Sequence, residues 1–308
     1  MKFNGSRVAF GRHETFALRY SWLTKGFQAL MRNPNLFDND DAVVELGVGK
    51  NMVASIRYWL RAAQLITPQK PEEPYEIGKL VFDASKGMDP YLEDEATIWL
   101  VHWLIATNPS LATSWYWFFN KFHKPEFTGQ ELQTALADFL NENVDKNKRP
   151  SLGTLKNDAL LLPRMYTQSH GNTRTPMEES LDSPLALLGL VTQSAGGRAY
   201  QSKPEARPRL PIGVFSFAVA QSMQQKSSTT IPIEELMYSR DDFATAGSVF
   251  RLTEMDLITK LELMLDYLPG RFELRDTAGL HQLYKIKDVD PLDYIKRHYF
   301  ETQAGMAA

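Results

Sequence analysis

The stretch LGVGKNMVASIRYWLRAAQLI, from Leu46 to Ile66, decides how the first part of the chain folds. Its GVGK segment has two interpretations, a phosphate-binding P-loop or the turn of a helix-turn-helix. A P-loop needs a glycine five positions before the glycine of GK and a Ser or Thr directly after the lysine. The chain has Val44 and Asn51 at these positions, so its backbone could not wrap phosphates and magnesium would lack a hydroxyl ligand. We therefore reject the P-loop.

The helix-turn-helix interpretation fits the spacing of the same stretch. Asp40 or Asp41 can cap a short helix, DAVVEL, and Gly47 and Gly49 bracket a turn where glycine tolerates a left-handed backbone. A second helix is expected from about Asn51, with a buried face made of Met52, Ile56, Trp59, Leu60 and Ala63. The side chains left outward, apt for phosphates and base edges, are Lys50, Asn51, Ser55, Arg57 and Arg61. The other interpretation is an ordinary two-helix corner with solvated charges.

Composition limits the class of protein. The 308 residues are 43% hydrophobic and 23% charged, which is typical of a globular chain. Cysteine is absent, which excludes disulfides, thiolate zinc sites and cysteine nucleophiles. The longest apolar run, TIWLVHWLIA, is about half a membrane span, so we expect a cytoplasmic protein without a membrane partner.

The charge is unevenly distributed. The net charge is −3, but residues 1–61 hold nine Lys or Arg against five Asp or Glu. A basic N-terminal segment on an acidic remainder is compatible with one surface that faces DNA and others that face proteins.

The chain shows three rounds of helix, turn with a second helix, and hairpin. The first round runs from a helix at 14–32 through the helix-turn-helix to an expected strand at 77–82, read as a wing. The second has a capping-box pattern at Thr128 and Glu131, a helix starting at Ser151 and a hairpin around SAGG at 194–197. The third has a helix capped by Thr253 and a hairpin around DTAG at 276–279. We predict a mainly α fold with small β-hairpins (α+β), in tandem winged helix-turn-helix-like units at 1–85, 86–212 and 213–308.

Two segments could carry chemistry. FGRHETF, from Phe10 to Phe16, places His13 beside Glu14, and such a pair can act as a general base and its orienter. The alternative is that His13 caps a helix start while Glu14 meets the positive end of that helix. In DPYLEDE, the carboxylates of Asp89, Glu93 and Asp94 could hold Mg²⁺ or Mn²⁺ for phosphodiester cleavage. The alternative is an acid-rich first turn of a buried helix.

One histidine and one aromatic block are expected to lie in the hydrophobic core. His102 is expected to be a satisfied core histidine. The aromatic block SWYWFFNKF, at 114–122, could stack bases but is more typical of a core. A complete nuclease motif is missing from the sequence.

Several phrases together resemble a known family: FGRHETFALRYSWLTKGF, LGVGKNMVASIRYW, DPYLEDEATIWLVHW with WYWFFN, TLKNDALLL, and DTAGLHQLYKI. From about Phe10 to about Tyr284 the chain resembles the SspB family of bacterial DNA phosphorothioation (Ssp) systems, long filed as a domain of unknown function. The resemblance implies DNA binding and single-strand nicking in a system that replaces a phosphate oxygen by sulfur for antiviral defence. It also implies three partners: a cysteine desulfurase, an ATP-pyrophosphatase-like sulfur transferase and an ATPase.

The family pattern covers His13, Glu14, Thr15, Arg19, Gly47, Gly49, Lys50, Asn51, Ile56, Arg57, Trp59, Asp89, Glu93, Asp94, Trp99, His102, Asp158, Asp276 and Gly279. The resemblance implies that position 54 often holds a basic residue, whereas this chain has Ala54, which would weaken one phosphate contact.

We predict a DNA-binding component of a phosphorothioate modification system that nicks one strand with Mg²⁺ or Mn²⁺. The candidate catalytic residues are His13, Glu14, Asp89 and Asp94, and the candidate metal ligands are Asp89, Glu93 and Asp94. The candidate DNA contacts are Arg12, Arg19, Lys50, Asn51, Ser55, Arg57, Arg61 and Lys156. A non-catalytic DNA-recognition and assembly subunit, a winged-helix transcription regulator and a homodimer all stay open at this stage.

Overall fold

The computed structural model describes residues 2–38, 41–168, 183–194, 196–277 and 280–306. It is a mixed α+β protein that is mostly helical and has two small antiparallel sheets, which confirms this part of the predicted fold class. The chain divides into two compact units. The N-terminal unit comprises Asn4–Trp117 and Lys124–Lys203, and the C-terminal unit comprises Met1–Phe3, Phe118–His123 and Pro204–Ala308.

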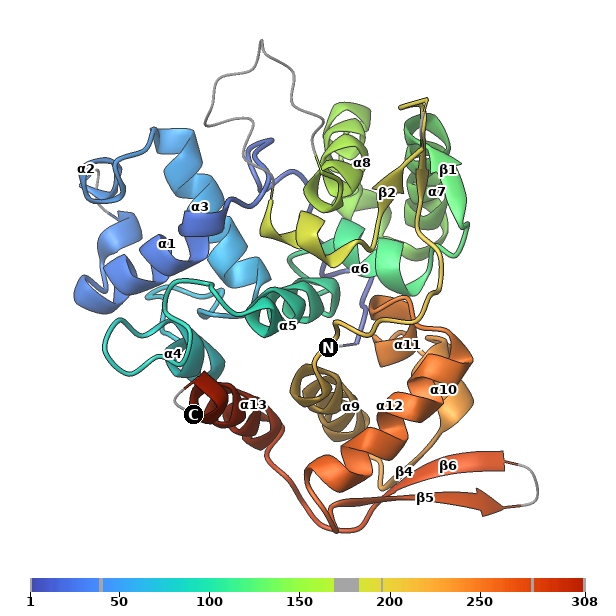
Figure 1. Cartoon of the computed structure of the whole chain (residues 1–308). Coiled ribbons are helices and arrows are strands. Elements are labelled where there is room, and N and C mark those ends of the chain that lie inside the picture. Colours follow the sequence, from blue (N-terminus) through green and yellow to red (C-terminus); the bar gives the residue numbers. More distant parts are fainter. Residues whose placement is uncertain (1, 39–40, 169–182, 195, 278–279, 307–308) are drawn as a thin grey trace. The chain divides into compact units, whose positions relative to one another are not determined.

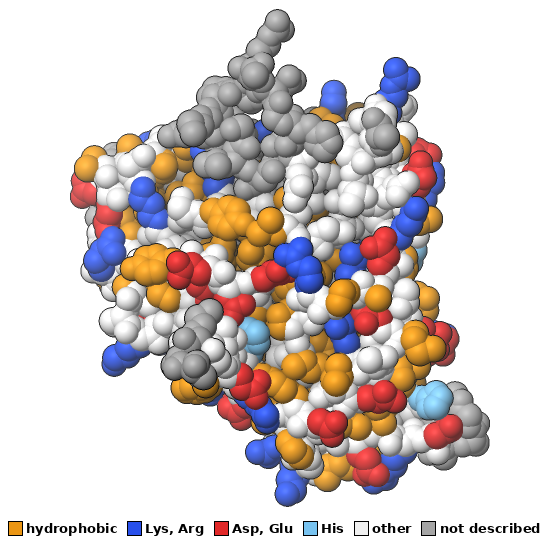
Figure 2. Space-filling view, viewed as in Figure 1, with side chains coloured by type: hydrophobic (Ala, Val, Ile, Leu, Met, Phe, Trp, Pro, Cys, Tyr) orange, Lys and Arg blue, Asp and Glu red, His pale blue; other side chains and the backbone are white. Residues whose placement is uncertain are grey.

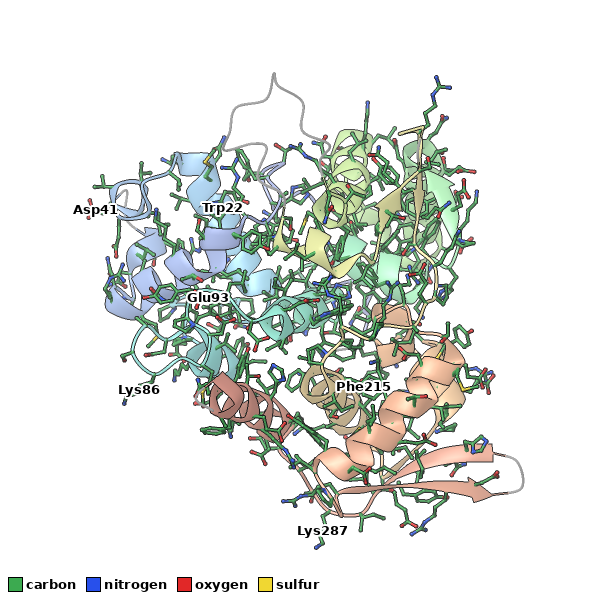
Figure 3. All side chains as sticks on the ribbon, viewed as in Figure 1. Trp22, Asp41, Lys86, Glu93, Phe215 and Lys287 are labelled. Atoms are coloured by element: carbon green, nitrogen blue, oxygen red, sulfur yellow. The ribbon has the colours of Figure 1, made fainter. Side chains whose placement is uncertain are left out.

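The N-terminal unit begins with four helices, α1 and three that pack against it, shown in blue and cyan in Figure 1. They are α1 (Tyr20–Arg32), α2 (Ala42–Leu46), α3 (Lys50–Ala62) and α4 (Glu76–Phe82), with the 3-10 helix η1 (Leu36–Asp38) between α1 and α2. Helix α1 packs against α2, α3 and α4. Its buried face includes Trp22 (Figure 3) and Phe27, whose side chains are almost completely shielded from solvent.

The prediction of a strand at 77–82 is wrong, because this segment lies in the helix α4. Its buried residues, Ile77, Gly78, Val81 and Phe82, recur at helical spacing. A short apolar run cannot be assigned to strand or helix by periodicity alone, and here packing decides. Gly78 lies so close to the Phe27 ring that a Cβ atom would come within 2.5 Å of it.

The rest of the N-terminal unit contains the most apolar helix and the first sheet. Helix α5 (Glu95–Ala106) and the aromatic block in α6 (Thr113–Asn120) are buried, which confirms the core interpretation of that block. There follow β1 (Glu126–Thr128), α7 (Gly129–Asn143), η2 (Lys146–Lys148), α8 (Leu152–Tyr166), η3 (Pro184–Leu188), β2 (Thr192–Gln193) and β3 (Ala199–Gln201). The predicted capping box at Thr128 and Glu131 is present. The helix predicted to start at Ser151 is α8, and Ser151 is its N-cap.

The C-terminal unit repeats this order of elements. Its helices are α9 (Ile212–Lys226), α10 (Ile233–Met237), α11 (Ala246–Val249), α12 (Glu254–Tyr267) and α13 (Leu292–Met306), and its strands are β4 (Thr230–Pro232), β5 (Phe272–Thr277) and β6 (Leu280–Lys285). The predicted hairpin is β5–β6, with its pairing running from Phe272 opposite Lys285 to Thr277 opposite Leu280. Thr253 caps α12 as predicted.

The two sheets share one topology. In the N-terminal unit the strand order is β1–β3–β2, and in the C-terminal unit it is β4–β6–β5. In each case a short strand precedes the helices and then pairs with the second strand of the hairpin that follows them. The second and third predicted rounds therefore each end in the expected hairpin. Within the described residues, no helix is long and apolar enough to cross a membrane.

Arg251 organises the C-terminal unit from the inside. It is 4% exposed and its guanidinium donates to the backbone carbonyls of Phe118 and Phe122 over 2.8 and 2.9 Å. The Phe118 and Phe119 rings lie 5.3 and 5.5 Å from the charge. Burial lowers the pKa of Arg251 to about 9, so the group remains charged at neutral pH. A charge in the core is tolerable here because carbonyl dipoles and ring faces surround it.

Replacing Arg251 by Met should therefore lower the free energy of unfolding by about 2–4 kcal/mol, because the carbonyls it serves would lose their donor inside the core. Urea unfolding measures this difference. The control is Arg240→Met, at an exposed side chain that pairs with Glu234, where little change is expected. Equal unfolding curves for the two variants would contradict this role of Arg251.

Candidate nucleic-acid interface

Helices α2 and α3 form the predicted pair of helices joined by a tight turn. Gly47 ends α2 with a left-handed backbone at φ 58°, and Gly49, in an extended conformation, is the N-cap of α3. The expected cap on α2 differs: Asp41 occupies the N-cap position without a side-chain capping hydrogen bond among the described residues. Asp40 lies outside the described residues. Glycine, and not a carboxylate, therefore defines the corner.

The start of α3 is exposed and electropositive. Lys50, Asn51 and Ala54 are exposed on its outer face. The first turn contains no acidic residue, and the N-cap glycine has no side chain that could occupy the N–H groups of this turn. Such a helix end attracts anions, because its free N–H groups and its dipole both favour negative charge.

The prediction that Ser55 faces outward is wrong. Ser55 is completely buried, as are Trp59 and Ala62, which lie four and seven positions further along α3. The buried stripe of α3 is thus wider than the apolar residues alone indicate. Ser55 cannot touch DNA from this position.

Arg57 and Arg61 are only partly exposed and are held by a buried carboxylate. The side chain of Glu72 is 2% exposed and accepts hydrogen bonds from both arginines, including one of 2.6 Å from Arg57 Nε. Burial lowers the pKa of Arg61. Asp38 adds a second acid, 3.5 Å from Arg57, and a hydrogen bond from Lys70 lowers the pKa of that carboxyl. These arginines therefore fix the segment after α3, and their guanidinium groups are already engaged by carboxylates.

The loop 10–19 is fastened to α3 and α8 by His13, whose side chain is fully buried. Its Nδ1 accepts a 3.1 Å hydrogen bond from the Thr15 N–H. The ring proton is therefore on Nε2, which donates a 2.9 Å hydrogen bond to Asp158. Asp158 also accepts from the Gly11 N–H and from Ser114 Oγ, over 2.9 and 2.6 Å. The Trp59 ring stacks on His13 with centroids 6.4 Å apart. Both nitrogens of His13 are thus engaged inside the protein, which suits anchoring better than proton transfer to a substrate.

The same loop contains backbone strain. Glu14 and Thr15 have φ values of 49° and 64°, the left-handed region that residues with a Cβ atom rarely occupy. The helix expected from Glu14 starts only at Tyr20 for this reason. The side chains of Arg12, Glu14 and Thr15 are exposed, so the anchored loop presents a cation, a carboxylate and a hydroxyl to solvent. Strain of this kind persists only where surrounding contacts enforce it, and it is concentrated at functional sites.

The acidic segment before α5 is arranged as a helix start. Asp89 is 5% exposed and accepts from the Glu93 and Asp94 N–H groups over 2.8 and 3.1 Å, and also from the Thr97 hydroxyl. Asp94 caps α5 by accepting from the Ala96 N–H. Only Glu93 (Figure 3) has an exposed side chain among these three acids. Within the described residues, no group of three or more His, Cys, Asp or Glu could hold a metal ion. Asp89 thus serves the local fold, which the sequence anticipated as the alternative.

The remaining predicted contacts differ in exposure. Arg19 is half-buried, with its guanidinium 5.2 Å from the Trp22 ring, and Lys156 is exposed on α8.

The sequence did not indicate Glu72 or the partnership of His13 with Asp158. Glu72 could not be singled out because its neighbour Glu73 looks equivalent in sequence. The pair of His13 and Asp158 could not be found because 145 residues separate them.

We expect Asp158→Asn to lower the free energy of unfolding by about 1.5–3 kcal/mol, because the new NH2 group would replace one of the two oxygens that accept hydrogen bonds from His13, Gly11 and Ser114. Chemical denaturation followed by tryptophan fluorescence reports the change, since Trp59 contacts the anchor. Asp138→Asn, at an exposed position of α7, is the matched control. If both variants are as stable as the parent chain, the anchor has been misassigned.

Comparison with known proteins identifies the family of this chain. The model of a family described as "Protein of unknown function (DUF4007)" matches residues 10–299. A solved structure described as "SspB crystal structure" matches with a TM-score of 0.81 at 28% identity, covering 97% of this chain and 89% of the other. A second, "Magnesium ion-bound SspB crystal structure", matches with a TM-score of 0.82 at 28% identity and coverages of 97% and 88%. The curated proteins contain no match. The chain therefore belongs to the DUF4007 family and is SspB-like in structure.

Proposed function

We propose that this protein is the DNA-binding component of a DNA phosphorothioate modification system that serves antiphage defence. Similarity to SspB over 97% of the chain supports membership of such a system. The observation that carries DNA binding is the exposed, acid-free start of α3 after the Gly47–Gly49 turn. In helix-turn-helix proteins this end of the second helix meets the bases in the major groove.

The chemistry of α3 assigns different tasks to its side chains. Lys50 neutralises a phosphate, and Asn51 can form two hydrogen bonds to an adenine edge. The first-turn N–H groups take a second phosphate oxygen. Arg57 and Arg61 are engaged by Glu72 in the segment after α3, and Ala54 leaves the middle of the exposed stripe without charge. Contact is thus concentrated at the N-terminus of α3.

Replacing both Lys50 and Asn51 by Ala should weaken duplex binding severalfold and reduce the slope of log K against log salt by about 1, since one phosphate contact is lost. Fluorescence anisotropy titrations at several salt concentrations give both quantities. Lys86→Ala removes one exposed charge from the loop after α4 (Figure 3) and should leave both unchanged. A double variant that binds like the Lys86→Ala control refutes the role of α3.

A second candidate function, nicking of one strand, is favoured by the strained loop at Glu14 and Thr15. In this proposal the exposed Glu14 carboxylate accepts a proton from the water that attacks phosphorus, and the bond to the leaving sugar oxygen breaks. The described residues include no group of three or more acids or histidines that could hold a metal ion. Magnesium is present in one SspB relative, and it therefore belongs in the assay.

Supercoiled plasmid incubated with the protein in magnesium or manganese buffer tests nicking, with EDTA as a parallel condition. The parent chain should produce open circles, and Glu14→Gln should abolish them while retaining DNA affinity. Asp89→Ala should instead lower the melting temperature, because Asp89 caps the segment before α5. Intact DNA binding without any open circles would leave a recognition and assembly subunit. Its proposed partners are the cysteine desulfurase, the ATP-pyrophosphatase-like sulfur transferase and the ATPase.

A further inference from the structure

We propose that α8 and the β2–β3 hairpin form a second DNA-binding surface, distinct from α3. This inference rests on the proposed DNA-binding function and deepens it. We call this surface the α8 face and define it by the outward side chains of α8, namely Leu152, Lys156, Asn157, Leu160 and Arg164.

The topology places α8 where a recognition helix belongs. Helix α7 leads through a turn at 144–151 into α8, and the β2–β3 hairpin follows. This order, with β1 pairing on β3, is that of a winged helix-turn-helix, in which the second helix of the pair enters the groove. The turn itself exposes Lys146 and Lys148, and Arg198 is exposed just before β3. Cations therefore flank α8 on the adjoining turn and hairpin.

The α8 face combines charge with exposed apolar surface. Leu152, Lys156, Leu160 and Arg164 recur every fourth residue and form one stripe. The two leucines are 77% and 53% exposed, so both are accessible to a ligand on this face. Alternating cations and aliphatic side chains suit the DNA backbone, where phosphates alternate with apolar sugars.

The acid of α8 is turned inward. Asp158 is 1% exposed, and its oxygens accept hydrogen bonds from His13, Ser114 and Gly11. The only carboxylate in α8 is thereby removed from the outer surface, which leaves Lys156 and Arg164 as the charged side chains of the α8 face. The anchor that holds the loop 10–19 thus also sets the charge of the α8 face.

The equivalent helix of the C-terminal unit shows the opposite chemistry. Helix α12 follows β4 and precedes the β5–β6 hairpin, as α8 follows β1 and precedes the β2–β3 hairpin. The exposed side chains of α12, however, include Glu254, Glu262 and Asp266. Figure 2 shows red acidic side chains over this region. Phosphates would be repelled there. One topology therefore occurs twice, and only the α8 copy has the charge that DNA requires.

A hollow beside α8 gives the surface a defined contact point. It has a volume of about 180 Å³ and is lined by Thr15, Asn157, Leu160, Leu161 and Arg164. Among the lining residues, Leu160 and Leu161 suit a deoxyribose or a thymine methyl group, and Arg164 suits the adjacent phosphate. Thr15 belongs to the strained loop, so DNA held here would also touch that loop.

Removing the two cations tests the inference. The variant Lys156→Ala/Arg164→Ala should bind duplex DNA severalfold more weakly, and its log K against log salt slope should fall by about 2. Lys156→Arg/Arg164→Lys retains both charges and should retain the slope. The charge-matched control is Lys86→Ala/Lys287→Ala, at two exposed lysines outside α3 and α8 (Figure 3). Melting temperatures should not change, because both α8 cations are exposed.

The outcomes separate this inference from the proposed function. A parent chain that binds DNA, together with an α8 variant of unchanged affinity and slope, overturns the α8 face alone. A loss equal to that of the lysine control also overturns it, because net charge would then explain the effect. A parent chain that does not bind DNA overturns the proposed function and this inference with it. A slope lowered only in the α8 alanine variant supports the surface.

Discussion

The hydrogen bond from His13 to Asp158 joins segments 145 residues apart, and much of the N-terminal unit depends on it. Because His13 also stacks on Trp59, the same side chain ties the loop 10–19 to α3 and to α8 at once. The strained backbone at Glu14 and Thr15 is sustained by these contacts. Because both ring nitrogens of His13 are hydrogen-bonded inside the protein, this side chain is suited to position its neighbours. In the proposed nicking reaction, the reactive groups are then the exposed side chains beside it.

Buried carboxylates decide which cations reach the surface. Glu72 engages Arg57 and Arg61 on α3, while Asp158 turns away from the surface of α8. The first removes positive charge from DNA contact and the second removes negative charge from a basic face. Net charge is −3 for the chain, so the proposed DNA binding must depend on such local arrangements. Local contacts of this kind can give specificity and salt dependence in a protein whose net charge is negative.

Local signals in the sequence were enough to predict many elements. The glycine turn before α3, the capping box at Thr128 and the β5–β6 hairpin each depend on a few adjacent residues, and each is present. Features that depend on distant packing were not predictable. Segment 77–82 became a helix because Gly78 allows close contact with Phe27, and Ser55 was drawn into the core. The partners of Asp158 and Glu72 leave no trace in spacing, so the anchored loop and the neutralised arginines required the structure.

The most direct measurement is photocrosslinking of duplex DNA to the full chain with a benzophenone side chain placed singly at Ala54, Leu160 or Met255. All three positions are exposed, on α3, α8 and α12. We expect crosslinks from positions 54 and 160 and none from 255, because DNA is proposed to contact α3 and the α8 face and not the acidic helix α12. Crosslinking from 255 alone, or from none of the three while the protein remains bound to DNA, would contradict it.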